Sequence, residues 1–350
     1  MIKKFFRNCF IIFLPFAFCL LPSILPFVSA QSGRATQQTP KTQTQKPSAP
    51  PAQDTRPRRA NEPEQDDDKP LKLSADLVTA ITSVTDPAGN QINTLTKDDF
   101  IIYEDNKEQE IASCYREGQM PLRMVFLFDT STSIRSRFDF EQRAAAQFFR
   151  YLLRPGDKAA IISVASDARL ETPFTADVNR LVNTLANLQA QGATALYNAI
   201  SLAAKYLSKE DGRHVMVVLS DGTDTASGIT LAQALKDVQK SDTVIYGVHS
   251  TGVAPSLNVQ DLAGEFVMKA MSEDTGGRAF FPPIYEDTKK ETRDLDEIYK
   301  RIAAEVRAQY VLTYYSKNDV RTKNYRAIRV EVKRPGLQVR ARNGYYTVKD

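Results

Sequence analysis

The sequence predicts an α/β fold in which helices flank a doubly wound, mostly parallel sheet. A flanking all-β, sandwich-like domain is expected to form from both ends of the mature chain. Over residues 121–308, continuous apolar runs of β-forming residues alternate with helical periods, which is typical of a sheet covered on both faces. Residues 71–120 and 309–350 instead carry short strand patterns and turns. Each flank is too short to bury a good core alone, so we expect the two to pack together.

The first thirty residues have the layout of a secretory signal peptide. A basic start precedes an apolar stretch, and Val28-Ser29-Ala30 forms a small-residue cleavage site. A retained membrane anchor is the alternative, but prolines interrupt the apolar stretch and no basic stop follows it. We therefore expect cleavage, no membrane insertion afterwards, and a secreted, periplasmic or cell-surface protein.

Residues 31–70 are expected to form a disordered tether. The segment is rich in Gln and Pro, and its only apolar residues are alanines. Such a composition cannot bury enough apolar surface to offset the conformational entropy of the chain.

Composition excludes several classes of protein. Lys and Arg total 46 and Asp and Glu total 42, and three of the cations lie in residues 1–30. The remaining chain is nearly neutral, which gives no electrostatic reason to expect nucleic acid as a partner. Three cysteines do not make a disulfide scaffold, and two histidines argue against a His-ligated zinc enzyme.

The first flank, 71–120, contains strand patterns separated by turn residues. The strand patterns lie at residues 77–85, 100–103 and 110–115, and the turn residues at 86–90 and 104–107. Cys114 lies in the last strand, where we expect a buried core thiol rather than a reactive one.

The central part, 121–308, alternates strands with helices. Continuous apolar runs predict strands at residues 124–128, 159–162, 215–219 and 244–246. Apolar stripes at helical spacing predict helices at residues 140–152, 181–188, 196–207 and 295–306. In such sheets, ligands bind at the carboxyl ends of the strands.

The second flank, 309–350, carries four strand patterns. They lie at residues 310–315, 325–332, 337–340 and 345–348. The opposed faces of the two flanks are expected to come from Phe100, Ile102, Val311, Tyr315, Ile328 and Val330.

Oxygen-bearing side chains gather in three loops at the carboxyl edge of the predicted sheet. Asp129, Ser131 and Ser133 follow the first strand directly. Thr194 opens a helix, and Asp221 follows the strand at 215–219. Hydroxyl and carboxylate oxygens suit Mg²⁺, with Mn²⁺ or Ca²⁺ as alternatives. Each group alone could simply cap a helix, but the joint pattern favours a metal site.

The same loops resemble the metal-ion-dependent adhesion site of von Willebrand factor type A domains. The D-x-S-x-S run at 129–133, the threonine loop at 192–197 and the Asp221-Gly222 pair match in order and placement. The resemblance covers about residues 122–307. Residues 99–105 and 343–346 add a likeness to secreted bacterial members with a leading β segment.

The resemblance implies a role for each residue. Ser131 and Ser133 would bind the cation directly, and Thr194 directly or through water. Asp129 and Asp221 would act through water or orient the serines. Neutral direct ligands leave the positive charge of the cation poorly compensated. The resemblance therefore implies a protein partner that supplies Asp or Glu.

No catalytic residue is predicted. Ser131 occupies the position where an aspartyl-nucleophile phosphatase needs a second acid, and the sequence has no G-x-S-x-G elbow or P-loop lysine. Two alternatives to a metal-dependent binding module remain open. One is a hydrolase, either metal-dependent or of the Ser–His type with His249. The other is a structural scaffold with an unoccupied site.

Overall fold

The computed structural model of this protein describes residues 77–116, 119–132, 137–250, 259–283, 288–318 and 324–347. All of them belong to one compact unit. Three parts of the prediction lie outside the described residues: the signal peptide at 1–30, the tether at 31–70 and the candidate ligand Ser133.

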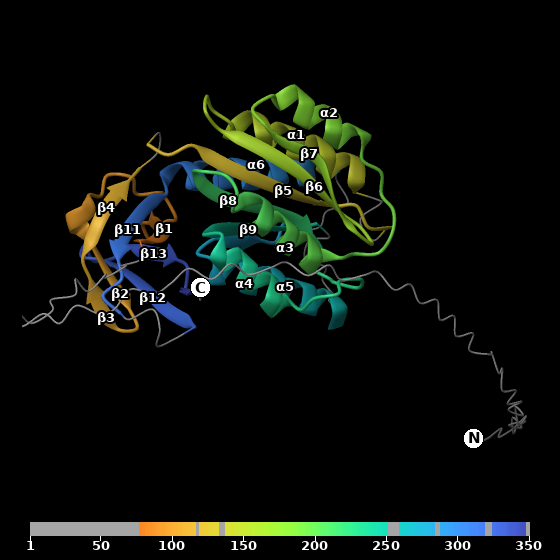
Figure 1. Cartoon of the computed structure of the whole chain (residues 1–350). Helices are drawn as coiled ribbons and strands as arrows, with labels where there is room; N and C mark the ends of the chain where they lie inside the picture. Colours follow the sequence, from red (N-terminus) through yellow and green to blue (C-terminus); the bar gives the residue numbers. More distant parts are fainter. Residues whose placement is uncertain are drawn as a thin grey trace, which may run out of the picture. The chain divides into compact units, whose positions relative to one another are not determined.

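A six-stranded sheet forms the centre of the α/β part, in the order β10-β9-β8-β5-β6-β7 (Figure 1). Its parallel strands are β5 (Leu122–Asp129), β6 (Lys158–Val164), β8 (Arg213–Ser220), β9 (Thr243–His249) and β10 (Arg278–Phe280). The edge strand β7 (Ala168–Thr175) runs antiparallel to β6. The prediction of a mostly parallel sheet is therefore confirmed.

Helices cover both faces of this sheet. One face carries α1 (Phe138–Leu152), α2 (Val178–Asn187) and α6 (Thr288–Ala308). The other carries α3 (Leu196–Leu207), α4 (Leu231–Lys240) and α5 (Val259–Asp274). Because successive residues of a strand point to opposite faces, β5 serves both cores. Phe126 and Phe128 face the first group, and Val125 and Leu127 face the second.

Two antiparallel sheets form the flanking β domain. One has the order β13-β1-β11-β4 and the other β14-β12-β2-β3. The strands from the first flank are β1 (Leu77–Thr85), β2 (Phe100–Glu104), β3 (Lys107–Gln109) and β4 (Ile111–Tyr115). Those from the second are β11 (Tyr310–Tyr315), β12 (Tyr325–Val332), β13 (Gln338–Ala341) and β14 (Gly344–Tyr346). Each sheet thus combines strands from both ends of the described chain, which confirms the predicted fold class.

The face of β11 that enters the β-domain core was predicted wrongly. Tyr310, Leu312 and Tyr314 enter that core, so the alternate residues point the other way. Val311 packs into the α/β core instead, and Tyr315 is 55 % exposed. By contrast, Phe100, Ile102 and Ile328 are buried in the β-domain core and Val330 is partly buried there, as expected.

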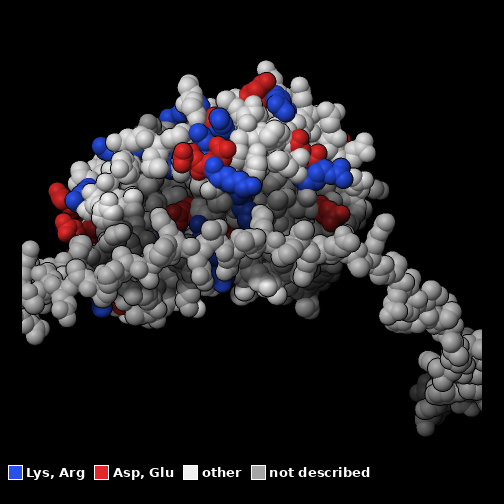
Figure 2. Space-filling view, viewed as in Figure 1, with Lys and Arg blue, Asp and Glu red and all other residues white. Residues whose placement is uncertain are grey.

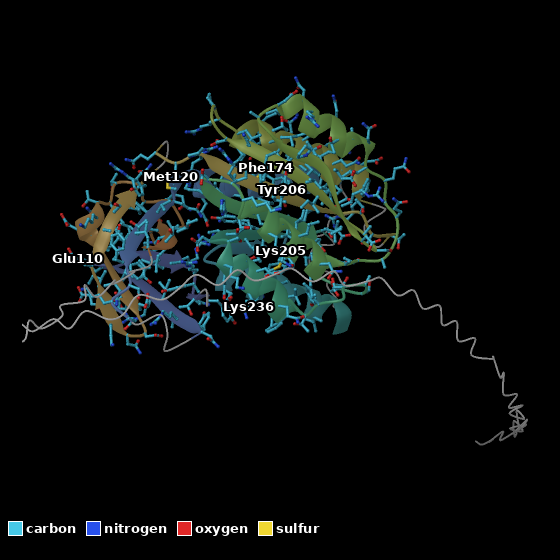
Figure 3. All side chains as sticks on the ribbon, in the orientation of Figure 1. Glu110, Met120, Phe174, Lys205, Tyr206 and Lys236 are labelled. Carbon is cyan, nitrogen blue, oxygen red and sulfur yellow. The ribbon has the colours of Figure 1, made fainter. Side chains whose placement is uncertain are left out.

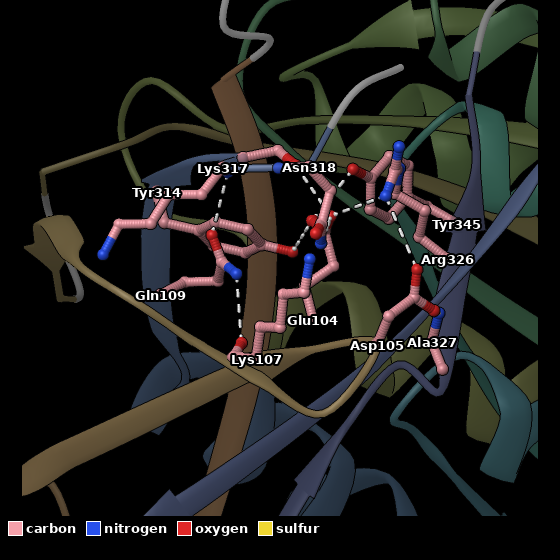
Figure 4. A network of polar contacts seen from close by, with 11 residues as sticks. Glu104, Asp105, Lys107, Gln109, Tyr314, Lys317, Asn318, Arg326, Ala327 and Tyr345 are labelled. Carbon is pink, nitrogen blue, oxygen red and sulfur yellow. Dashed lines mark hydrogen bonds and ion pairs between the residues drawn. The ribbon is translucent and has the colours of Figure 1, made fainter. Parts of the chain in front are cut away.

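A buried carboxylate joins the two flanks (Figure 4). Glu104, at the end of β2, is fully buried and accepts hydrogen bonds from the hydroxyls of Tyr314 (2.8 Å), Tyr345 (3.0 Å) and Ser316 (2.7 Å). Its carboxylate lies 3.3 Å from Nη1 of Arg326. Every one of these partners comes from the second flank, so Glu104 connects β2 of the first flank to the second flank inside the β domain.

Charged side chains of both signs lie interspersed on the face shown in Figure 2. Lys205 of α3 and Asp237 of α4, for example, form an ion pair of 3.1 Å. This mixture agrees with the small net charge of the sequence. Among the helices described, none is long and apolar enough to cross a membrane.

Candidate functional site

The predicted site residues lie where three chain segments meet at the carboxyl edge of the central sheet. Asp129 is the last residue of β5, which lies between β6 and β8. Its register partner on β6 is Val164, and the preceding Phe128 is opposite Leu219 on β8. Because parallel strands end at the same edge, the segments after β5 and β8 are neighbours.

Asp129 connects two of these segments. Its carboxylate is fully buried, with Oδ1 accepting from the backbone N–H of Ser131 at 2.8 Å. The other oxygen, Oδ2, accepts from the hydroxyl of Ser220 at 2.6 Å. Burial raises the pKa of Asp129 to about 6, although the hydrogen bonds from Ser220 and Ser131 oppose this shift. Through these two hydrogen bonds, Asp129 connects the loop after β5 to the end of β8.

Asp221 lies just beyond β8 and is 9 % exposed. Its Oδ1 accepts hydrogen bonds from the backbone N–H of Thr223 at 2.9 Å and the hydroxyl of the same residue at 2.6 Å. The negative charge of Asp221 contributes to the raised pKa of Asp129. The two predicted carboxylates therefore lie close enough to influence each other.

The glycine after Asp221 is required by close packing. Gly222 has a φ of +78°, and a Cβ atom there would lie 2.3 Å from the carbonyl oxygen of Gly264 on α5. Only glycine satisfies both the positive φ and the contact. Gly222 thus allows α5 to pack closely against the loop that carries Asp221.

Thr194 lies in the third segment, between the other two. The preceding Gly192 accepts a hydrogen bond from the N–H of Thr132 at 3.3 Å. On the other side, Thr194 accepts from the N–H of Thr225 at 2.8 Å and donates its own N–H to the Thr225 hydroxyl at 3.0 Å. Thr194 is 4 % exposed, and its hydroxyl makes no hydrogen bond to the described residues.

Sequence reasoning did not identify the groups that hold the threonine loop in place. Asp224 accepts a hydrogen bond from the N–H of Tyr197 at 3.0 Å, and Ser227 accepts from the N–H of Asn198 at 3.0 Å. Both N–H groups belong to the first turn of α3, where helices leave donors unpaired. The sequence Thr-Asp-Thr-Ala-Ser at residues 223–227, rich in capping side chains, is the signal that could have indicated this role.

The structure therefore brings together Asp129, Ser131, Thr194 and Asp221 through one network of loops. The donors are hydroxyl and carboxylate oxygens, the set that hard divalent cations prefer. The described part of the chain contains no group of three or more His, Cys, Asp or Glu side chains that could hold a metal.

His249 has the surroundings of a core residue. It ends β9, is 2 % exposed, and its ring centroid lies 5.5 Å from that of Phe281. A general base needs access to the group that it deprotonates. The packing of His249 favours a structural role.

One family model matches the central part of the chain. Residues 124–240 match the model for the von Willebrand factor type A domain. Inter-alpha-trypsin inhibitor heavy chain H4 from Bos taurus is 25% identical over 210 residues, which are 56% of this chain and 22% of that protein. The chain therefore spans about a fifth of the length of that relative.

Solved structures show weaker likenesses. A von Willebrand factor type A protein from Catenulispora acidiphila has a TM-score of 0.43 and 12% identity, covering 79% of this chain and 74% of that one. An aerotolerance-related membrane protein from Bacteroides fragilis, solved with multiple mutations to serine, has a TM-score of 0.41 and 20% identity. That match covers 53% of this chain and 98% of the other.

Proposed function

We propose, because this chain contains a von Willebrand factor type A domain, that it binds another protein at the carboxyl edge of its central sheet. Domains of this family serve in protein–protein interaction. We infer further that a divalent cation mediates the contact and that the partner supplies an Asp or Glu side chain. The leader pattern in residues 1–30 supports a secreted, periplasmic or cell-surface location for this binding.

The buried carboxylate of Asp129 is the observation that carries the proposal. It is held between the Ser131 backbone and the Ser220 hydroxyl. A buried carboxylate is costly unless positive charge or hydrogen bonds compensate it. The hydrogen bonds from Ser131 and Ser220 compensate the Asp129 carboxylate in part, and a cation bound by the adjacent hydroxyls would add to that compensation. Asp129 would then orient the metal ligands rather than occupy the open face itself.

The remaining donors would complete the metal shell. Ser131 and Ser133 would bind through their hydroxyls, and Thr194 directly or through water. Asp221 would act through water, since one of its oxygens already accepts two bonds from Thr223. We favour Mg²⁺, with Mn²⁺ and Ca²⁺ as alternatives, because all donors are oxygens.

A cation held by neutral hydroxyls retains most of its positive charge. It therefore favours an anionic ligand at its open position, and a carboxylate of another protein fits that requirement. The metal–carboxylate contact is small, so it would be one part of a larger interface. The binding should depend on the cation and have modest affinity.

The test compares capture of proteins from the native extracellular fraction by the immobilised chain. Wild type should retain a partner in Mg²⁺ and release it in EDTA, and Thr194→Ala should not retain it. Thr79→Ala, on β1 of the β domain, serves as a matched threonine control and should behave as wild type. Capture that survives both EDTA and Thr194→Ala would contradict the proposal. It would favour a structural scaffold whose partner binds elsewhere.

A further inference from the structure

A cavity of about 420 Å³ lies beside the candidate metal site. One wall is the turn between β6 and β7, at Ala165, Ser166 and Asp167, and β7 adds Arg169 and Glu171. The opposite wall is the end of α2 and the residues that follow it, 187–189. The cavity therefore opens at the same edge of the sheet as the candidate site.

The loops of the candidate metal site also form part of the wall of the cavity. Thr130, which separates Asp129 from Ser131, lines the cavity, and so do Gln191 and Gly192 of the threonine loop. The N–H of Gln191 donates to the carbonyl of Thr130, and the N–H of Ala193 donates to the Ser166 hydroxyl at 3.1 Å. A ligand held at the metal position would thus have the cavity as its immediate neighbour.

The far walls are held in place by side chains outside the cavity. The ring of Phe174 on β7 stacks on that of Tyr206 on α3, with centroids 4.7 Å apart and planes 2° apart (Figure 3). The hydroxyls of Thr172 on β7 and Thr184 on α2 lie 2.6 Å apart. These contacts hold the edge strand β7 against α2 and α3.

The charged groups of the lining leave an excess of negative charge. Asp167, Arg169 and Glu171 all line the cavity, so two carboxylates face one guanidinium in its wall. Within the described part of the chain, none of the three forms an ion pair. Glu171 is half-buried and accepts a hydrogen bond from Ser163 at 2.6 Å.

The end of α2 adds to this negative field. The helix has ten residues and ends at Asn187, which lines the cavity. The C-terminus of a helix carries about half a negative elementary charge. Two carboxylates and a helix C-terminus therefore act on the same space, against the single cation Arg169.

We propose that this cavity receives a lysine or arginine side chain of the bound protein. The inference rests on the proposed function, in which the neighbouring cation holds an acidic residue of the same protein. The two positions are oppositely charged and adjacent, so they select a segment in which a basic residue lies near an acidic one. Glu171 and Asp167 are the specificity-determining residues, and the amides of Gln189 and Gln191 can bond to the peptide backbone.

Short synthetic peptides test the proposal without knowledge of the natural partner. One set of fluorescein-labelled, amidated peptides carries one Asp and one Lys, separated by none to three glycines. The matched set replaces Lys by norleucine, which keeps the alkyl chain and removes the charge. Fluorescence polarisation in saturating Mg²⁺ measures the affinity of each peptide for the full chain.

At the best spacing, wild type should bind the Lys peptide about fivefold more tightly than its norleucine match. Glu171→Gln should bring this ratio close to one and leave the affinity for the norleucine peptide unchanged. Asp167→Asn, a substitution at an exposed position, should lower the ratio in part. Glu108→Gln, at an exposed position of β3, is the control and should retain the wild-type ratio.

The outcomes separate this inference from the proposed function. Equal affinity of wild type for the two peptide sets at every spacing, with Mg²⁺-dependent binding, would overturn the cavity assignment alone. So would a Lys preference that survives both Glu171→Gln and Asp167→Asn. Binding that survives EDTA and Thr194→Ala would overturn the metal-dependent function. A Lys preference that still disappears in Glu171→Gln would then support the cavity by itself. A failure of all peptides to bind in Mg²⁺ would contradict the cavity assignment, whereas the proposed function, which requires a larger interface, is tested by the capture experiment.

Discussion

Nη1 of Arg326 lies 3.3 Å from Oε1 of Glu104, and the two side chains are 1 % and 0 % exposed. Glu104 ends a strand of the first flank, and Arg326 lies in a strand of the second. Removing one member of a buried pair leaves the other charge without compensation, which costs more than the pair itself contributes. This pair therefore makes the β domain depend on both ends of the described chain.

Glu104→Ala should lower the free energy of unfolding by about 3–5 kcal/mol, because the Tyr314 and Tyr345 hydroxyls lose an acceptor and Arg326 loses one carboxylate partner. Asp105, whose carboxylate lies 3.5 Å from Nη1 of Arg326, remains as a second partner. Urea unfolding followed by circular dichroism measures the change. Glu108→Ala, on the adjacent strand and exposed, should stay within about 0.5 kcal/mol of wild type. A loss below about 1 kcal/mol for Glu104→Ala would show that the buried network is weaker than its geometry implies.

Gly222→Ala should destabilise the chain by about 2 kcal/mol or more, since its Cβ would meet the Gly264 carbonyl at 2.3 Å and its φ is +78°. Gly228→Ala is a matched control, because its added Cβ meets nothing within 4 Å and its φ lies outside the positive region. That substitution should be neutral or slightly stabilising. Differential scanning calorimetry of both variants tests the difference, and equal melting temperatures would contradict the close approach of α5.

Mg²⁺ should raise the melting temperature by roughly 5–10 °C at one hundred times its dissociation constant, because it would bind only the folded chain. Thr194→Ala should lose most of this response and fold normally, since the Thr194 hydroxyl makes no hydrogen bond to the described residues. A scan in NaCl of equal ionic strength controls for screening. An unchanged Mg²⁺ response in Thr194→Ala would remove this residue from the metal shell.

Cys114 should react slowly with iodoacetamide at pH 8. Partial burial raises the pKa of its thiol, so the reactive thiolate is a smaller fraction at that pH than in an exposed cysteine. Peptide mass spectrometry that follows the Cys114 peptide alone should show a clear increase in rate when urea unfolds the chain. The same rate in both conditions would mean that the thiol is open to solvent in the native state.

The sequence alone predicted a strand or helix correctly where the pattern that identifies it lies within the element itself. Continuous apolar runs predicted β5 and β8 because both faces of these strands are covered. Strand β7, at the edge of the sheet, and the amphipathic helix α4 were not recognised. Strand β7 contains Pro173, and a proline within a run argues against a strand. In the site, the order of Asp129, Ser131, Thr194 and Asp221 along the chain was enough to predict their gathering, because parallel strands end at one edge.

Long-range polar partners could not be predicted. Glu104 appeared as the first residue of a turn, and only residues more than two hundred positions later make it a buried acceptor. The side on which Tyr315 lies also depends on the β1 and β4 neighbours of β11 rather than on local alternation. The cavity beside the site likewise could not be predicted, because segments that are distant in the sequence line it together.

The interleaved β domain also sets an order of events during synthesis. Among the described strands, β1 pairs with β11 and β13, and β2 pairs with β12 as well as with its neighbour β3. The first flank is therefore synthesised before its partner strands β11, β12 and β13, which follow only after the whole α/β part. Unpaired strand edges of this kind are prone to aggregation while they wait. A chain that stops before β11 would retain the elements of the α/β sheet but leave β1 and β2 as open edges. Premature termination would therefore yield an aggregation-prone chain rather than a smaller version of the protein.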